Sequence, residues 1–273
     1  MNFISAIEKR WLTVNSNICV GLDPYPEKFP ASIQNLPNPI FEFNKAIIDA
    51  THDLVCCYKP QFAHYAALDA LASLKQTIAY IKESYPDIPV ILDSKRGDIG
   101  TTAAMYAKEA FDVYKADAVT VNPYMGIDTI APFTEYKDKG VVVLCRTSNP
   151  GASELQNLIS QGKTLYETVA ELASKNWNNN NNILLVVGAT AADEMARIRE
   201  LTGNMIFLVP GIGAQGGDLS AVLRAGSTQN KTGLIINSSR GILYASQGDD
   251  FAQAARAETQ RLVHACQEIY QSF

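Results

Sequence analysis

The sequence predicts a single (β/α)8 barrel, the TIM-barrel fold, over residues 1–273. Eight short apolar runs, each ending in polar, Gly or Pro residues, recur along the chain. Their starts are about 31 residues apart, the length of one strand plus a crossover helix. Amphipathic segments occupy several of the intervals. An open, doubly wound sheet is the alternative, because it has the same alternation of strands and helices.

The eight predicted strands begin with continuous apolar runs rich in β-branched residues, as is typical of parallel strands covered on both faces. In chain order they span residues 18–23, 55–60, 90–95, 118–123, 141–146, 183–188, 206–211 and 233–239. A short helix is predicted before the first strand.

Apolar residues recur at helical spacing between the strands. Three predicted faces consist of Phe43, Ile47, Ala50 and Leu54; of Leu68, Leu71, Ile78 and Ile81; and of Phe251, Ala255, Leu262, Cys266 and Ile269. Residues 178–182 are five consecutive asparagines. Asparagine favours neither helix nor strand, so we expect a loop at the N-terminal face of the barrel, without a function.

The composition excludes several classes of protein. Hydrophobic residues make up 47% of the chain, and 23 Lys and Arg face 28 Asp and Glu, a net charge of −5. There is no cationic excess to neutralise nucleic-acid phosphates. No apolar run approaches the ~20 residues that span a membrane, and the N-terminus does not resemble a secretory signal. The five cysteines lack CxxC spacing, which indicates buried, reduced thiols and a cytoplasmic enzyme.

Catalytic groups of such barrels lie at the carboxyl ends of the strands. The polar residues predicted there are Asp23, Lys59, Asp93, Lys95, Asn122, Arg146 and Asn237.

The segment ILDSKRGDIGTT, residues 91–102, is the most informative. Asp93 and Lys95 share one side of an extended strand, Asp98 follows in a loop, and a helix is predicted to begin near Thr101 or Thr102. We expect an Asp–Lys–Asp cluster whose fixed ammonium stabilises a developing anion and donates a proton. A solvated group of ion pairs is the alternative. A Schiff-base lysine fits less well, because flanking carboxylates keep the amine protonated.

A phosphate site is predicted after the seventh and eighth strands, which carry VPGIGAQGGD (209–218) and INSSR (236–240). Glycine backbone N–H groups, Gln215 and Arg240 are the expected donors, and the first part of segment 211–231 is expected to be a mobile lid. After the fifth strand, Ser148 and Asn149 are placed to bond an amide-like ligand edge, or simply flank an Asn-Pro-Gly turn.

Taken in order, GLDP, YKPQ, DSKRGDIGTT, SNPGA, GIGAQGGD and SSRG resemble the orotidine 5′-phosphate decarboxylases, from about residue 18 to 240. The Arg-Gly pair within the signature is similar to the longer bacterial branch of that family, type 2. The resemblance implies conversion of orotidine 5′-phosphate to UMP and CO2 in de novo pyrimidine biosynthesis. It implies no metal and no organic cofactor.

The resemblance also implies roles for particular residues. Lys59, Asp93, Lys95 and Asp98 match the family's charged tetrad, with Lys95 as proton donor. Asp23 and Lys59 would hold ribose hydroxyls. Ser148 would bond the amide edge of the pyrimidine, and Gln215 and Arg240 would bind the phosphate. The protein would be a homodimer in which Asp98, Ile99 and Thr102 reach the partner's site. Its substrate would be a nucleotide. Neither nucleic acid nor a membrane would be a partner. Arg146, Asn230 and Lys231 receive no role.

Two other functions remain open. A magnesium-dependent sugar-phosphate decarboxylase shares the D-x-K-x-x-D core but needs a further carboxylate at the end of the second strand, where this chain has Lys59. A non-catalytic protein that binds nucleotide phosphates would have no need of the charged tetrad.

Overall fold

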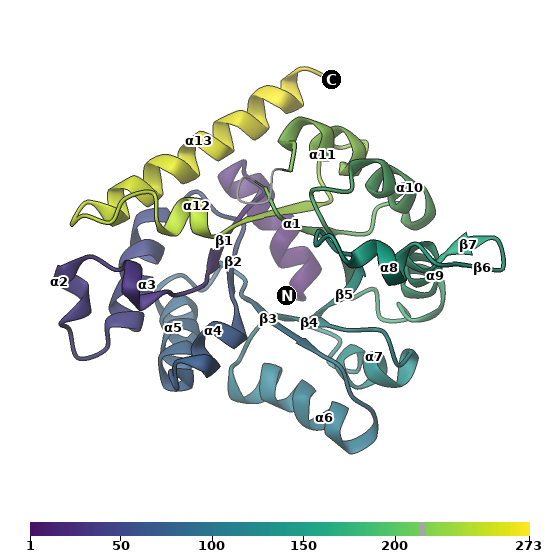
Figure 1. Ribbon diagram of the computed structural model, residues 1–273, viewed down its shortest axis with the longest axis horizontal. Helices are drawn as coiled ribbons and strands as arrows, with labels where there is room; N and C mark the ends of the chain where they lie inside the picture. Colours follow the sequence, from purple (N-terminus) through teal and green to yellow (C-terminus); the bar gives the residue numbers. More distant parts are fainter. Residues whose placement is uncertain (213–216) are drawn as a thin grey trace.

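The computed structural model describes residues 1–212 and 217–273, and its core is a closed barrel of parallel strands (Figure 1). The strands are β1 (Ile18–Leu22), β2 (Cys57–Pro60), β3 (Ile91–Arg96), β4 (Ala118–Val121), β5 (Gly140–Arg146), β8 (Ile183–Val187), β9 (Phe207–Pro210) and β10 (Leu234–Ser238). They pair in the order β2-β1-β10-β9-β8-β5-β4-β3. Parallel bridges from Tyr58 to Val90 and from Gln61 to Asp93 join β2 to β3 and close the ring. The predicted barrel is confirmed, and the open sheet is wrong.

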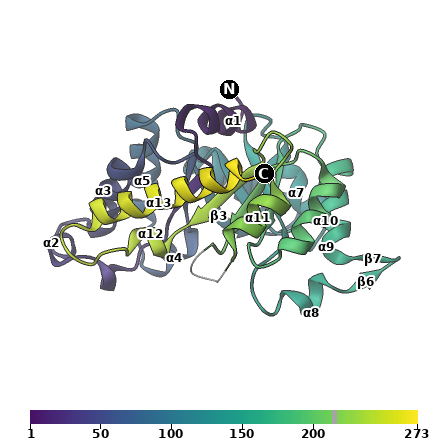
Figure 2. The same cartoon turned by 90° about the horizontal axis from the view of Figure 1, so that it is seen from above.

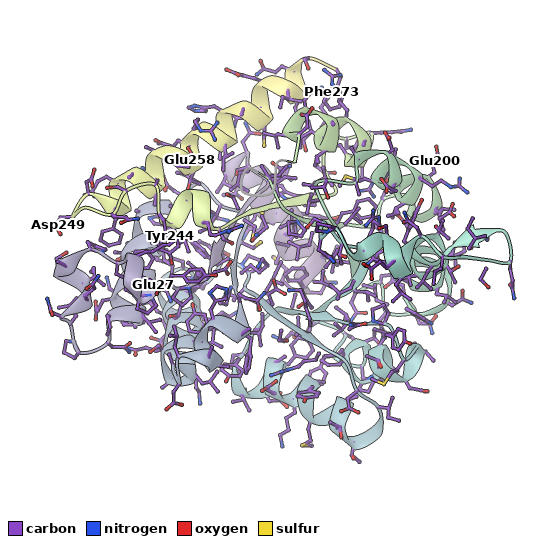
Figure 3. The ribbon with its side chains drawn as sticks, viewed as in Figure 1. Glu27, Glu200, Tyr244, Asp249, Glu258 and Phe273 are labelled. Carbon is purple, nitrogen blue, oxygen red and sulfur yellow. The ribbon has the colours of Figure 1, made fainter. Side chains whose placement is uncertain are left out.

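Helices surround the barrel in Figure 1, except α1, which lies across one end of it. The helices are α1 (Phe3–Val14), α2 (Ala31–Gln34), α3 (Pro39–Thr51), α4 (Phe62–Ala67), α5 (Leu71–Ser84), α6 (Gly100–Lys108), α7 (Ile127–Thr134), α8 (Ala152–Gln156), α9 (Leu165–Glu171), α10 (Ala192–Thr202), α11 (Leu219–Gly226), α12 (Arg240–Leu243) and α13 (Phe251–Gln271). A 3-10 turn, η1 (Pro26–Lys28), follows β1, and π-helical turns η2 (Glu109–Val113) and η3 (Leu172–Asn176) extend α6 and α9. Figure 3 shows Glu200 on α10 and Glu258 on α13 at the outer rim.

The strands bury side chains on both faces, which explains their apolar sequences. One core lies between strands and helices and includes Val119 and Val121 of β4. The other lies inside the barrel and takes the alternate residue, Ala118. By the same alternation Thr120, which is also buried, belongs to the interior. The interior is therefore apolar at one end and polar at the other.

Helix α1 closes the N-terminal end of the barrel, opposite α8 (Figure 2). Phe3, Ile7 and Trp11 are buried and pack into the interior core. Arg10 fixes the helix laterally, because its guanidinium donates to the carbonyls of His52 and Val55. The short helix expected before the first strand thus covers the N-terminal end of the barrel interior.

The predicted helical face that begins at Leu68 is partly wrong. Leu68 and Leu71 are exposed, whereas Ile78 and Ile81 are buried as expected. The backbone of Asp69 is left-handed (φ 52°), so the segment forms two helices, α4 and α5, and the helical register is interrupted between them.

Residues 152–164 contain α8 and the antiparallel hairpin of β6 (Ile159–Ser160) and β7 (Lys163–Thr164), which the strand pattern did not predict.

The asparagine run is a loop at the barrel floor, as predicted, but it has a structural role. The buried side chain of Asn182 donates to the carbonyls of Thr134, Tyr136 and Lys139. Asn178 accepts from the backbone N–H of Ile183, at the start of β8. These amides therefore hold the loop before β8 against the end of α7.

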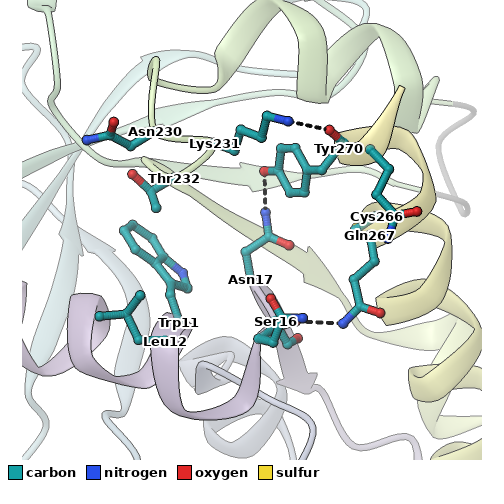
Figure 4. A pocket seen from close by; sticks show the side chains of 12 residues that line it. Trp11, Leu12, Ser16, Asn17, Asn230, Lys231, Thr232, Cys266, Gln267 and Tyr270 are labelled. Atoms are coloured by element: carbon teal, nitrogen blue, oxygen red, sulfur yellow. Dashed lines mark hydrogen bonds between the residues drawn. The ribbon is translucent and has the colours of Figure 1, made fainter. Parts of the chain in front are cut away.

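A cavity of about 400 Å³ lies between α1, α13 and the loop before β10 (Figure 4). Asn230 and Lys231 line it, and Lys231 donates to the carbonyl of Tyr270. The Tyr270 hydroxyl accepts from Asn17. Asn230 and Lys231, which received no role from the sequence, thus lie beside the N-terminal helix rather than at the carboxyl ends of the strands.

All five cysteines are unpaired and buried, as the sequence predicted. In the described ranges, no helix is both long enough and apolar enough to cross a membrane.

Candidate active site

A cavity of about 540 Å³ lies at the carboxyl ends of the strands. Residues from most strand ends line it, among them Asp23, Lys59, Asp93, Lys95, Ser148 and Arg240. A volume of this size accommodates a nucleotide-sized ligand. The structure therefore brings these six predicted site residues to one place, together with the predicted Asn149 and Asn237.

Asp93 is at the centre of the charged groups in this cavity. Its Oδ2 lies 2.8 Å from Nζ of Lys59, and its Oδ1 lies 2.7 Å from Nζ of Lys95. Lys59 and Asp93 are buried, whereas the side chain of Lys95 is 46% exposed. Of the two lysines, Lys95 is therefore the more accessible to a ligand in the cavity.

The pKa values of the buried pair follow from burial and from charge. Burial alone would raise the pKa of Asp93, but Lys59 and Lys95 outweigh it and hold that pKa well below its usual range. Burial alone would lower the pKa of Lys59, but Asp93 and Asp23 outweigh it and raise that pKa. Both groups are therefore charged at neutral pH.

The expected Asp–Lys–Asp cluster is wrong for a single chain, which instead has two lysines on one carboxylate. Asp98 does not line the cavity, and its Oδ1 accepts from the backbone N–H of Ile99. The reason is the backbone after Lys95. Lys95 is left-handed (φ 48°) and β3 shifts register against β4 between Leu92 and Arg96, so the chain leaves the strand direction.

Arg96 anchors this departing segment. Its guanidinium makes a bidentate pair with Glu109, at 3.0 Å for both bonds, and stacks over the rings of Phe62 and Tyr106. Helix α6 begins at Gly100, earlier than the predicted Thr101 or Thr102, and no side chain caps it. Ile99 and Thr102 are exposed, on the outside of the chain.

Two glycines let the loops around the cavity approach closely. A Cβ on Gly21, in the GLDP motif, would lie 1.8 Å from Oγ of Ser239. A Cβ on Gly188 would lie 2.7 Å from the backbone N of Ser148. Side chains at these positions would force apart the strand ends that carry the polar groups.

The loop after β1 is fixed by Tyr244, whose hydroxyl donates to the carbonyl of Asp23 and accepts from the N–H of Tyr25. Oδ1 of Asp23 is buried and lacks a hydrogen-bond partner among the described residues. Asp23 is thus an acceptor at the cavity wall that is ready for a ligand hydroxyl.

On the neighbouring strand end, after β10, Arg240 begins α12 and is exposed. Gln215, the other predicted phosphate donor, and the centre of the predicted lid lie in residues 213–216, outside the described ranges. The described flanks of that segment approach each other, because Ile212 and Gly217 form a parallel bridge.

Arg146 has a structural partner. It pairs with Glu194 on α10 at 3.2 Å and donates to the carbonyl of Thr147. Gln156 of α8 clamps the same loop through the N–H and the hydroxyl of Thr147. Ser148 and Asn149 line the cavity on this loop. Asn122 instead accepts from the N–H of Tyr124 and stays outside the cavity lining.

The sequence reasoning missed Gln61 and Thr120. Gln61 lines the cavity directly after β2. The hydroxyl of Thr120 donates to Asp93 at 2.9 Å from inside the barrel. The signal for Thr120 was present, because it is a polar residue at an inward position of an otherwise apolar strand.

Eight parallel strands with a charged cluster at their carboxyl ends define a (β/α)8-barrel enzyme. The chain belongs to the orotidine 5′-phosphate decarboxylase / HUMPS family, whose model matches residues 16–257. It is 61% identical over 259 residues to an orotidine 5′-phosphate decarboxylase of Cellvibrio japonicus, covering 94% of this chain and 95% of that one. The family resemblance drawn from the motifs is thereby confirmed.

Two solved structures, an OMP decarboxylase and a UMP synthase, contain the same fold as this chain. The structure of Leishmania donovani OMP decarboxylase superposes with a TM-score of 0.85 at 38% identity, covering 98% of this chain and 99% of that one. Leishmania donovani UMP synthase superposes with a TM-score of 0.87 at 41% identity, covering 98% of this chain but only 56% of that longer one.

Proposed function

We propose that this protein decarboxylates orotidine 5′-phosphate to UMP and CO2, a step of pyrimidine biosynthesis, without a metal or an organic cofactor. The observation that carries the proposal is the Lys59–Asp93–Lys95 array at the mouth of the barrel. Family membership and 61% identity to a relative of that name support it.

The proposed chemistry follows from where the charges lie. The bond between C6 of the pyrimidine and its carboxylate carbon breaks, CO2 leaves, and the electron pair stays on C6. The ammonium of Lys95 stabilises that pair and transfers a proton to C6, and the resulting amine regains a proton from water. Asp93 holds the ammonium in place from one side, and the buried charge of Lys59 keeps Asp93 ionised.

The remaining cavity residues bind the rest of the nucleotide in this proposal. Asp23 and Lys59 hold ribose hydroxyls, and Ser148 bonds the amide edge of the pyrimidine. Arg240, together with Gln215, binds the phosphate. The unpartnered oxygen of Asp23 and the exposed guanidinium of Arg240 support these assignments.

We further propose a homodimer in which Asp98, Ile99 and Thr102 complete the partner's site. Exposed apolar side chains gather on and between α6 and the start of α7, namely Ile99, Met105, Tyr124, Met125 and Ile127. A patch of this kind beside the cavity is suited to an interface with a second copy. The five buried, unpaired thiols suit a reducing compartment, and we place the enzyme in the cytoplasm.

The competing magnesium-dependent reading has less support. It calls for a carboxylate at the end of β2, where Lys59 stands with its ammonium on Asp93. Two cations on one carboxylate repel a divalent metal rather than attract it.

The test is to incubate the purified protein with orotidine 5′-phosphate in EDTA and to follow the ultraviolet absorbance change to UMP. Sustained turnover in EDTA is the expected result. No turnover in a folded sample, followed by turnover of a sugar phosphate on addition of magnesium, would establish the alternative. Nucleotide binding without turnover under either condition would favour a binding protein.

A further inference from the structure

Thr120 makes three hydrogen bonds behind the charged array. Its Oγ1 accepts from the backbone N–H of Ser94 at 3.0 Å and of Lys95 at 2.9 Å, and its proton goes to Oδ1 of Asp93 at 2.9 Å. A hydroxyl has one proton and two lone pairs, so its whole hydrogen-bonding capacity is used. The residue is 1% exposed and does not line the cavity.

Lys95 is thus connected to Thr120 at both ends. Its backbone N–H donates to the threonine directly. Its ammonium donates to the same Asp93 oxygen to which the threonine donates. The left-handed backbone of Lys95, φ 48°, is unfavourable for a residue with a Cβ and persists only where its surroundings impose it. The two N–H bonds to Thr120 are such a restraint.

We propose that Thr120 is a positioning residue for the reaction, and that its hydroxyl fixes the direction in which Lys95 presents its ammonium. The inference rests on the proposed role of Lys95 as proton donor. Thr120 acts through Asp93 and the backbone of residues 94–95 and touches no substrate.

A Thr120 that only fills space would respond differently to substitution than a Thr120 that positions Lys95. Valine has nearly the shape of threonine, and Val119 and Val121 flank the position. If Thr120 only filled space, valine would serve equally well. Without the hydroxyl, however, two backbone N–H groups and one carboxylate oxygen lose a partner inside the barrel, and the turn at Lys95 is free to relax.

The experiment compares Thr120→Val, Thr120→Ser and the control Thr129→Val. Thr129 is fully buried on α7, and its hydroxyl has no hydrogen-bond partner in the described part of the chain. We expect Thr120→Val to lower kcat about 10- to 100-fold, because small misplacements of a reacting group have effects of that size. The dissociation constant for UMP should stay within about 3-fold, since the groups that hold the nucleotide are intact. Thr120→Ser and Thr129→Val should keep kcat within about 3-fold.

Thermal unfolding and UMP binding establish that each variant is folded. If the valine variant does not fold, Thr120→Ala takes its place, because alanine leaves room for water; its kcat should then be at least about 5-fold below that of Thr120→Ser. Equal kcat for the serine variant and for the folded variant without a hydroxyl would overturn the inference. So would a parallel loss of UMP binding. A wild-type protein that is inert toward orotidine 5′-phosphate would instead overturn the proposed function, and the inference with it.

Discussion

Nζ of Lys59 lies 2.8 Å from Oδ2 of Asp93, and both side chains are buried at the carboxyl ends of β2 and β3. This pair is the fixed part of the charged array, because both side chains are buried and each is the other's charged partner. Lys95, on the other oxygen of the carboxylate, is half exposed and free to meet a ligand. Both lysines therefore keep the carboxylate charged, and Lys95 is the one whose side chain is more exposed to the cavity.

The buried pair predicts a pH-dependent stability. Because the pKa of Asp93 is lower in the folded chain, its contribution is present above the unfolded pKa of about 4 and is lost as pH falls toward the folded value. Asp93→Asn should lower the free energy of unfolding by about 3 kcal/mol between pH 5 and 8, with the difference shrinking below about pH 4. Urea unfolding across this range measures it. The exposed Asp138→Asn serves as control, and a difference that grows in acid would contradict the argument.

Lys95→Ala should reduce turnover by more than about 10⁴-fold, because the proton donor and the stabilising charge are lost together. Steady-state assays at high enzyme concentration measure the loss. Lys75→Ala, an exposed lysine on α5, is the matched control and should be unchanged. Retention of more than about a tenth of the wild-type rate would mean that Lys95 is not the proton donor.

Arg240→Ala should lower kcat/KM for orotidine 5′-phosphate about 10- to 100-fold through the loss of a charge-assisted bond to phosphate. Orotidine, which lacks the phosphate, should react equally slowly with the wild-type and variant proteins. A further loss with orotidine would show that Arg240 acts elsewhere than at the phosphate.

Mixed dimers test the composite site. Asp98→Ala and Lys95→Ala proteins should each be nearly inactive, yet an equal mixture should recover up to about a quarter of the wild-type activity after subunit exchange, because half the dimers then hold one intact site. Mass spectrometry of the mixture confirms the exchange. Exchange without recovery would place Asp98 in the site of its own subunit.

Asn182→Ala should destabilise the protein by about 1–3 kcal/mol, since three carbonyls each lose a hydrogen bond from the buried Asn182 amide. Its kcat should stay within about 2-fold, because the loop lies at the opposite end of the barrel. The exposed Asn179→Ala is the control. Urea unfolding and the decarboxylase assay suffice, and equal stability of the two variants would argue against the role assigned to Asn182.

Much of the fold was predictable because parallel strands buried on both faces leave a strong apolar signal. All eight predicted strands agree with the structure to within two residues at each end. The hairpin of β6 and β7 was not predictable in this way, because its two-residue strands are mostly exposed and leave no apolar run in the sequence.

The candidate site was predictable where a motif places its residues at strand ends, as for Lys59, Asp93 and Arg240. The predicted place of Asp98, in a loop beside Lys95, was wrong within one chain, because the sequence pattern cannot anticipate the left-handed backbone of Lys95. The partners of Arg146, and the bonds of Thr120, join segments distant in sequence and become visible only in three dimensions.

The packing of α1 constrains the order in which the chain folds during synthesis. Every strand of the barrel contributes a side chain to the interior core that receives Phe3, Ile7 and Trp11. Helix α1, which is synthesised before any strand of the barrel, thus has no complete docking surface until the last strand, β10, has been synthesised. Helix α1 precedes the barrel in the sequence but packs onto it only after the strands have formed. Until then Trp11 stays accessible to water, so its fluorescence would report the final closure of the barrel.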